Sequence, residues 1–105
     1  MPLREEHCLE ALKTCYDPEL PVNIVDLGLV YRCQVQPSSQ GGYEVTVQMT
    51  LTAPGCAMAE LLKEDVESKL AALPEVRAAR VELVFDPPWD PSRMSEAARL
   101  ALGLL

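Results

Sequence analysis

The stretch Tyr43-Glu44-Val45-Thr46-Val47-Gln48-Met49-Thr50-Leu51-Thr52-Ala53-Pro54-Gly55-Cys56 decides how this chain folds. Its first ten residues alternate between apolar and polar side chains, which is typical of a strand with one buried face. The inward-facing set is predicted to be Tyr43, Val45, Val47, Met49 and Leu51. The outward-facing set is predicted to be Glu44, Thr46, Gln48, Thr50 and Thr52. Pro54-Gly55 then indicates a turn that leads into a helix.

Cys56 follows that turn and is expected at the start of the helix. Unpaired backbone N–H groups and the positive end of the helix dipole favour the thiolate over the thiol there. The thiolate is the form that attacks electrophiles and binds soft metals. Cys56 is therefore the first candidate for a chemical centre.

The flanking sequence predicts three helices and two further strands around this strand. Hydrophobic periodicity predicts helices over Arg4–Tyr16, Ala57–Leu73 and Ser92–Leu102, strands over Leu29–Gln36 and Arg80–Phe85, and a hairpin loop over Pro37–Gly42. Asp90 or Ser92 is expected to cap the last helix. The order α-β-β-α-β-α predicts a single compact α/β (α+β) domain over residues 1–105, with helices on a small mixed sheet built from a β-hairpin. The strand–helix–strand unit is expected to form a right-handed crossover.

Apolar residues mark the face that each of these elements should bury. The expected buried sets are Leu29, Tyr31, Cys33 and Val35; Cys8, Ala11, Leu12 and Cys15; Met58, Leu61, Leu62, Val66, Leu70 and Leu73; and Val81, Leu83 and Phe85.

Composition limits the classes of function. The chain has 105 residues, of which 49% are hydrophobic and 24% charged, with a net charge of −7. Nine basic residues scattered among sixteen acidic ones argue against nucleic acid or an anionic membrane surface as a partner. The sequence contains neither a membrane-spanning apolar run nor a hydrophobic N-terminal segment, so we expect a cytoplasmic protein.

The cysteine pattern does not predict a self-contained metal site. Cysteines occur at 8, 15, 33 and 56 without a Cys-x-x-Cys pair, and His7 is the only histidine. Disulfides are not expected in a cytosolic chain. Cys8, Cys15 and Cys33 are interpreted as small core residues.

Two segments are expected to meet at one edge of the sheet. Asp17–Gly28 mixes Asp17, Glu19, Asn23 and Asp26 with apolar residues, and it leads into the strand that pairs with 43–52. Either this loop is a turn capped by its own carboxylates, or burial of its apolar half draws the carboxylates towards the body of the protein. The hairpin places it beside Thr50, Thr52 and Cys56, which together could hold an anion or a soft metal centre.

Three ordered blocks of sequence resemble the SufT/PaaD-like family of iron–sulfur assembly factors. They are Asp17-Pro18-Glu19-Leu20-Pro21-Val22-Asn23-Ile24-Val25-Asp26-Leu27-Gly28-Leu29-Val30-Tyr31, then Thr50–Cys56, and then Pro87-Pro88-Trp89 with Met94-Ser95-Glu96. The resemblance implies a small α/β domain whose pocket is lined by Asp17, Glu19, Thr50, Thr52 and Cys56. It also implies supporting positions at Asn23, Asp26, Gly28, Pro54, Gly55 and Trp89. Ala57 stands where members often have proline, and the absence of C-terminal cysteines favours the SufT-like side.

The resemblance and the residues together favour a non-catalytic factor that assembles or targets iron–sulfur clusters, with Cys56 as its functional thiolate. No stably bound cofactor is expected, because a single thiolate could hold at most a labile cluster shared in trans. Expected partners are the assembly machinery, client apoproteins and a second copy of the chain in a weak homodimer. One alternative is a small cysteine-dependent enzyme, although the chain offers no suitable histidine base for one. The other alternative is a pure protein–protein adaptor.

Overall fold

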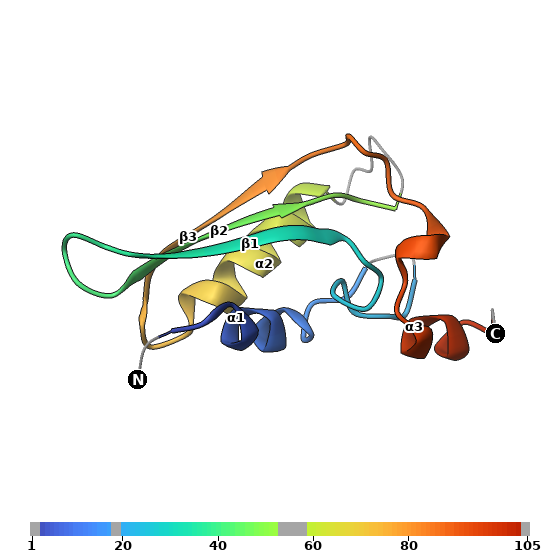
Figure 1. The fold of residues 1–105 in the computed structure, drawn as a ribbon, viewed down its shortest axis with the longest axis horizontal. Coiled ribbons are helices and arrows are strands. Elements are labelled where there is room, and N and C mark those ends of the chain that lie inside the picture. Colours follow the sequence, from blue (N-terminus) through green and yellow to red (C-terminus); the bar gives the residue numbers. More distant parts are fainter. Residues whose placement is uncertain (1–2, 18–19, 53–58, 104–105) are drawn as a thin grey trace.

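A computed structural model describes residues 3–17, 20–52 and 59–103 of the chain (Figure 1). Its elements are α1 (Glu5–Leu12), β1 (Val30–Pro37), β2 (Tyr43–Met49), α2 (Ala59–Ala71), β3 (Val76–Leu83), a 3-10 turn (Pro91–Arg93) and α3 (Glu96–Ala101). The strands form one sheet in the order β1-β2-β3, antiparallel between β1 and β2 and parallel between β2 and β3. The predicted element order and the mixed sheet built on a hairpin are both confirmed.

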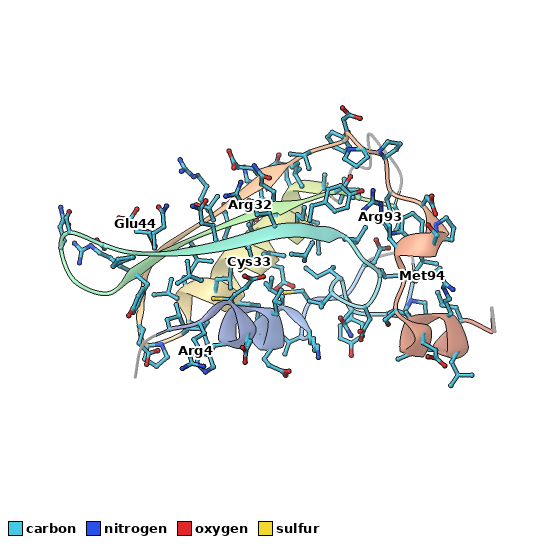
Figure 2. The ribbon with its side chains drawn as sticks, viewed as in Figure 1. Arg4, Arg32, Cys33, Glu44, Arg93 and Met94 are labelled. Atoms are coloured by element: carbon cyan, nitrogen blue, oxygen red, sulfur yellow. The ribbon has the colours of Figure 1, made fainter. Side chains whose placement is uncertain are left out.

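Helices α1 and α2 cover one face of the sheet (Figure 1). Figure 2 shows Cys33 pointing from β1 towards α1, whereas Arg32 and Glu44 stand on the opposite, exposed face. In the register of the sheet, Val47 of β2 lies between Cys33 and Val81. The apolar side chains of β2 therefore point to the helix-covered face and lie in the layer between the sheet and the helices.

The core is built around β2 and α2. Val45, Val47 and Met49 are at most 1% exposed, and Leu51 is also buried, as the alternation of this segment predicted. From α2, Leu62, Val66 and Leu70 are buried at a spacing of four residues, which keeps them on one side of the helix. Burying each such side chain contributes about 1.5–3 kcal/mol relative to exposure.

Helix α1 is shorter than its apolar stripe predicted. It ends at Leu12 instead of Tyr16, and the chain then turns, with the Cys15 N–H donating to the Leu12 carbonyl. Tyr16 pairs with Asn23 in an isolated antiparallel bridge, which requires extended backbone. The predicted burial of Cys8, Leu12 and Cys15 is confirmed, because Cys15 still faces the core from the turn.

Two predicted side-chain directions are wrong near the site. The register of β1 shifts between Val30 and Arg32, and this irregularity removes Tyr31 from the buried face that Leu29 and Cys33 share. The Tyr31 hydroxyl instead donates to the Pro87 carbonyl. Thr50 was expected to face outward but is only 1% exposed, and it lies just beyond the end of β2 at Met49.

The second half of the chain also departs from its periodic pattern. Leu61 was predicted to be buried but is 56% exposed, because the buried side of α2 is formed by Leu62, Val66 and Leu70. Strand β3 begins at Val76, four residues before the predicted Arg80, because Val76 already pairs with Tyr43. It ends at Leu83, which leaves Phe85 46% exposed beyond the strand. Met58, also assigned to the α2 stripe, lies outside the described residues.

The predicted helix over Ser92–Leu102 is divided in two. The Ser92 N–H donates to Asp90 Oδ1 at 2.6 Å, so Asp90 caps the 3-10 turn. Hydrogen bonding with the Ser92 side chain, reinforced by this backbone bond, lowers the pKa of the Asp90 carboxyl. Met94 is extended, with φ −67° and ψ 144°, and it interrupts the helical path. Helix α3 then begins with its own cap, since the Ala98 N–H donates to Ser95 Oγ at 3.1 Å.

The two termini lie at opposite ends of the 45 Å long axis (Figure 1). The N-terminus is at the end that holds the β1–β2 hairpin loop. The C-terminus is at the end where β2 finishes. None of the helices in the described ranges is long and apolar enough to cross a bilayer.

Candidate functional site

The end of β2 and the acidic loop meet at one edge of the sheet, as the hairpin pairing predicted. The Thr52 hydroxyl donates to Asp17 Oδ2 at 3.4 Å, across 35 residues of sequence. One step inside, the Thr50 N–H donates to the Leu29 carbonyl at 2.9 Å and continues the β1–β2 ladder beyond Met49. The fold therefore brings Asp17 and Thr52 into contact, and it pairs Thr50 with Leu29 of the segment that follows the acidic loop.

Asp17 is a buried carboxylate, with 7% of its surface exposed. Its Oδ1 accepts a hydrogen bond from the Leu20 N–H at 3.1 Å, and its Oδ2 accepts the bond from Thr52. Burying a carboxylate is costly unless such donors compensate for lost water. Asp17 thus satisfies both interpretations of the loop, since it caps a local turn and also reaches the strand end.

Asn23 and Asp26 form a second, local unit within the loop. Asn23 Nδ2 donates to Asp26 Oδ2 at 2.7 Å, and the Asp26 N–H donates back to Asn23 Oδ1 at 2.9 Å. The donor to the Asp26 carboxylate is thus a side-chain amide, whereas a backbone N–H was expected. Both residues are half-buried, so the pair holds the loop in shape without forming an open pocket of its own.

The C-terminal segment clamps this loop from the other side. Trp89 Nε1 donates to the Leu27 carbonyl at 2.6 Å, and the Ser95 N–H donates to the Asp26 carbonyl at 2.7 Å. Gly28 has a φ of +78°, and a Cβ on it would overlap the Arg93 carbonyl. Gly28 and Trp89 therefore support the loop. Ser95 belongs to the Met94-Ser95-Glu96 block, but the sequence did not indicate that its backbone N–H is part of this clamp.

The remaining residues assigned to the site lie outside the described residues: Glu19, Pro54, Gly55 and Cys56. The other cysteines are core residues, as predicted. Burial, reinforced by Asp65, raises the pKa of Cys15 to about 12. A thiol–thiol hydrogen bond lowers the pKa of Cys8 and raises that of Cys33. Within the described ranges, no three His, Cys, Asp or Glu side chains gather where they could hold a metal ion.

Residues 5–83 match the model of a family described as iron–sulfur cluster assembly protein. This match covers most of the chain, and the chain therefore belongs to that family, as the three sequence blocks predicted.

Individual relatives agree with this assignment. A Fe-S protein maturation auxiliary factor of Porphyromonas gingivalis is 46% identical over 101 residues, which cover 96% of this chain and 92% of that protein. The Fe-S protein maturation auxiliary factor SufT of Staphylococcus aureus is 42% identical, covering 84% of this chain and 96% of that protein. A crystal structure from Bacillus anthracis, titled as a domain of unknown function DUF59, superposes with a TM-score of 0.82 at 39% identity and covers 96% and 92% of the two chains.

Proposed function

We propose that this protein is an auxiliary factor for the maturation of iron–sulfur proteins, with Cys56 as its functional thiolate. The observation that carries the proposal is the hydrogen bond between Thr52 and the buried Asp17. It fixes the acidic loop against the strand end that leads, four residues later, to Cys56. Four residues span at most about 14 Å, so Cys56 is tethered close to this contact by the chain alone.

The cluster is cargo in this proposal, and it passes through the site without becoming a resident cofactor. Iron–sulfur clusters are held mainly by thiolates, and usually by four of them. Cys8, Cys15 and Cys33 are buried in the core and are not available as surface ligands without disrupting it. Cys56 therefore supplies one ligand, and the others come from a client apoprotein, from the assembly machinery or from a second copy of the chain. Shared ligation of this kind suits a factor that must release its cluster.

Asp17 and Thr52 have a positioning role in this proposal. Their hydrogen bond joins the acidic loop to the end of the segment that continues β2. Thr50 is buried two residues earlier, and its N–H bonds to the Leu29 carbonyl. These residues hold the chain in one geometry up to Thr52, four residues before Cys56 in the sequence.

The test is the substitution Cys56→Ser in a strain that depends on this protein for the activity of an iron–sulfur enzyme. We expect the variant to keep the circular dichroism spectrum and melting temperature of the wild type, while client enzyme activity falls to the level of the deletion strain. Cys33→Ala is the matched control, since it also removes one thiol but from the core. It should lower stability and leave maturation intact at permissive temperature. Normal maturation by Cys56→Ser would refute the assignment of the thiolate.

A further inference from the structure

A shallow cleft of about 470 Å³ lies where the C-terminal segment crosses the start of β1. It is lined by Gly28, Val30, Tyr31, Pro87 and Arg93. Figure 2 shows Arg93 beside the beginning of β1. None of these residues belongs to the Asp17–Thr52 contact, so the cleft is a separate feature of the same end of the molecule.

The walls of this cleft are fixed by contacts between distant parts of the chain. The Tyr31 hydroxyl donates to the Pro87 carbonyl at 2.9 Å, across 56 residues of sequence. Gly28 has no side chain, and this allows the Arg93 backbone to pack directly against it. The cleft is therefore formed before any ligand arrives, which reduces the entropy lost on binding.

Arg93 gives the cleft a positive charge that is available to a ligand. Its guanidinium carbon lies 4.6 Å from the centre of the Tyr31 ring, an arrangement that orients the planar group. In the described part of the chain, the one ion pair joins Lys13 to Glu10, and no hydrogen bond of the Arg93 side chain is found. The charge of Arg93 acts on the nearby Asp90 carboxylate, but that carboxylate accepts its hydrogen bond from the Ser92 N–H and not from Arg93.

We infer that this cleft binds an acidic segment of a partner protein, in which a carboxylate pairs with Arg93 and a neighbouring apolar side chain packs on Val30, Pro87 and the Tyr31 ring. A stacked guanidinium presents paired N–H donors that match a carboxylate in a bidentate geometry. A single carboxylate would also balance the one positive charge of the cleft, since Arg93 is the only cation among the described residues that line it. A phosphate group would bring nearly two negative charges to a protein whose net charge is already −7.

Nuclear magnetic resonance titration of the full-length protein tests this inference. The probe is an end-blocked tripeptide with a glutamate between two leucines, compared with its glutamine counterpart at constant ionic strength. We expect saturable shifts at the amides of Gly28, Val30 and Tyr31 and at Arg93 Nε. Arg93→Gln should weaken binding at least tenfold. Arg32→Gln, which removes the same charge from an exposed position of β1 outside the cleft, should leave binding unchanged.

Arg93→Lys separates recognition by the guanidinium from simple charge, and it should recover only part of the lost affinity. The inference is wrong if the glutamine peptide binds equally well, or if Arg93→Gln and Arg32→Gln weaken binding to the same extent. Tighter binding of inorganic phosphate, or no saturable shift with the glutamate peptide, would also overturn it. The titration uses neither cluster nor client, so its failure would leave the maturation role standing.

Discussion

Replacing Trp89 by Phe tests how firmly the C-terminal segment clamps the loop that carries Asp26 and Gly28. The substitution keeps an aromatic ring but removes the indole N–H, which donates to the Leu27 carbonyl at 2.6 Å in a partly buried position. Losing a bond of this kind and leaving its acceptor without a donor costs about 1–2 kcal/mol. For a domain of 105 residues, this corresponds to a decrease of about 4–8 °C in melting temperature.

Thermal unfolding followed by far-ultraviolet circular dichroism measures this effect, and Tyr31→Phe is the matched control. Tyr31→Phe also removes one donor to a backbone carbonyl, but at an exposed position where water can replace it. We expect it to cost less than about 0.5 kcal/mol. Hydrogen exchange should also speed up at the Ser95 amide in Trp89→Phe, since that amide belongs to the same clamp. Equal melting temperatures for Trp89→Phe and the wild type would show that the clamp does not stabilise the fold.

Two further predictions concern the backbone at Gly28 and the thiol of Cys15. Gly28→Ala should destabilise the domain by more than about 1 kcal/mol in urea unfolding, because the new Cβ meets the Arg93 carbonyl and φ is +78°. Gly41 also has a positive φ but has open space around it, so Gly41→Ala should destabilise the domain less. Equal losses of unfolding free energy in the two variants would contradict the steric argument. The pKa of Cys15 is raised from 9.0 to about 12, so its stabilising contribution is complete below pH 9 and is lost as the pH rises towards 12. Between pH 8 and pH 10 the wild type should therefore lose about 1 kcal/mol more unfolding free energy than Cys15→Ala, and parallel curves would contradict this.

The sequence was sufficient to predict the parts of the fold that depend on local periodicity. The alternation from Tyr43 to Leu51 predicted the central strand, its buried face and its pairing with β1. The same pairing then predicted that Asp17 and Thr52 would lie together. Each of these results follows from the chain's own period and from the short hairpin loop.

The incorrect predictions depend on contacts between distant segments. Tyr31 leaves the buried face because the register shifts there and Pro87 supplies an acceptor for its hydroxyl. The predicted C-terminal helix is interrupted at Met94, while the neighbouring Ser95 N–H bonds to the Asp26 carbonyl. No periodicity within either segment carries this information, because the partner lies more than fifty residues away along the chain.

Because the two termini lie at opposite ends of the molecule, the choice of terminus decides which end a tag or a sensor surface will cover. A tag, fluorophore or sensor surface joined through the N-terminus would sit beside the hairpin loop, away from the end of the molecule at which β2 finishes (Figure 1). The same attachment through the C-terminus would crowd the end of the molecule at which β2 finishes. Immobilisation through the N-terminus is therefore the orientation in which partner binding should be measured.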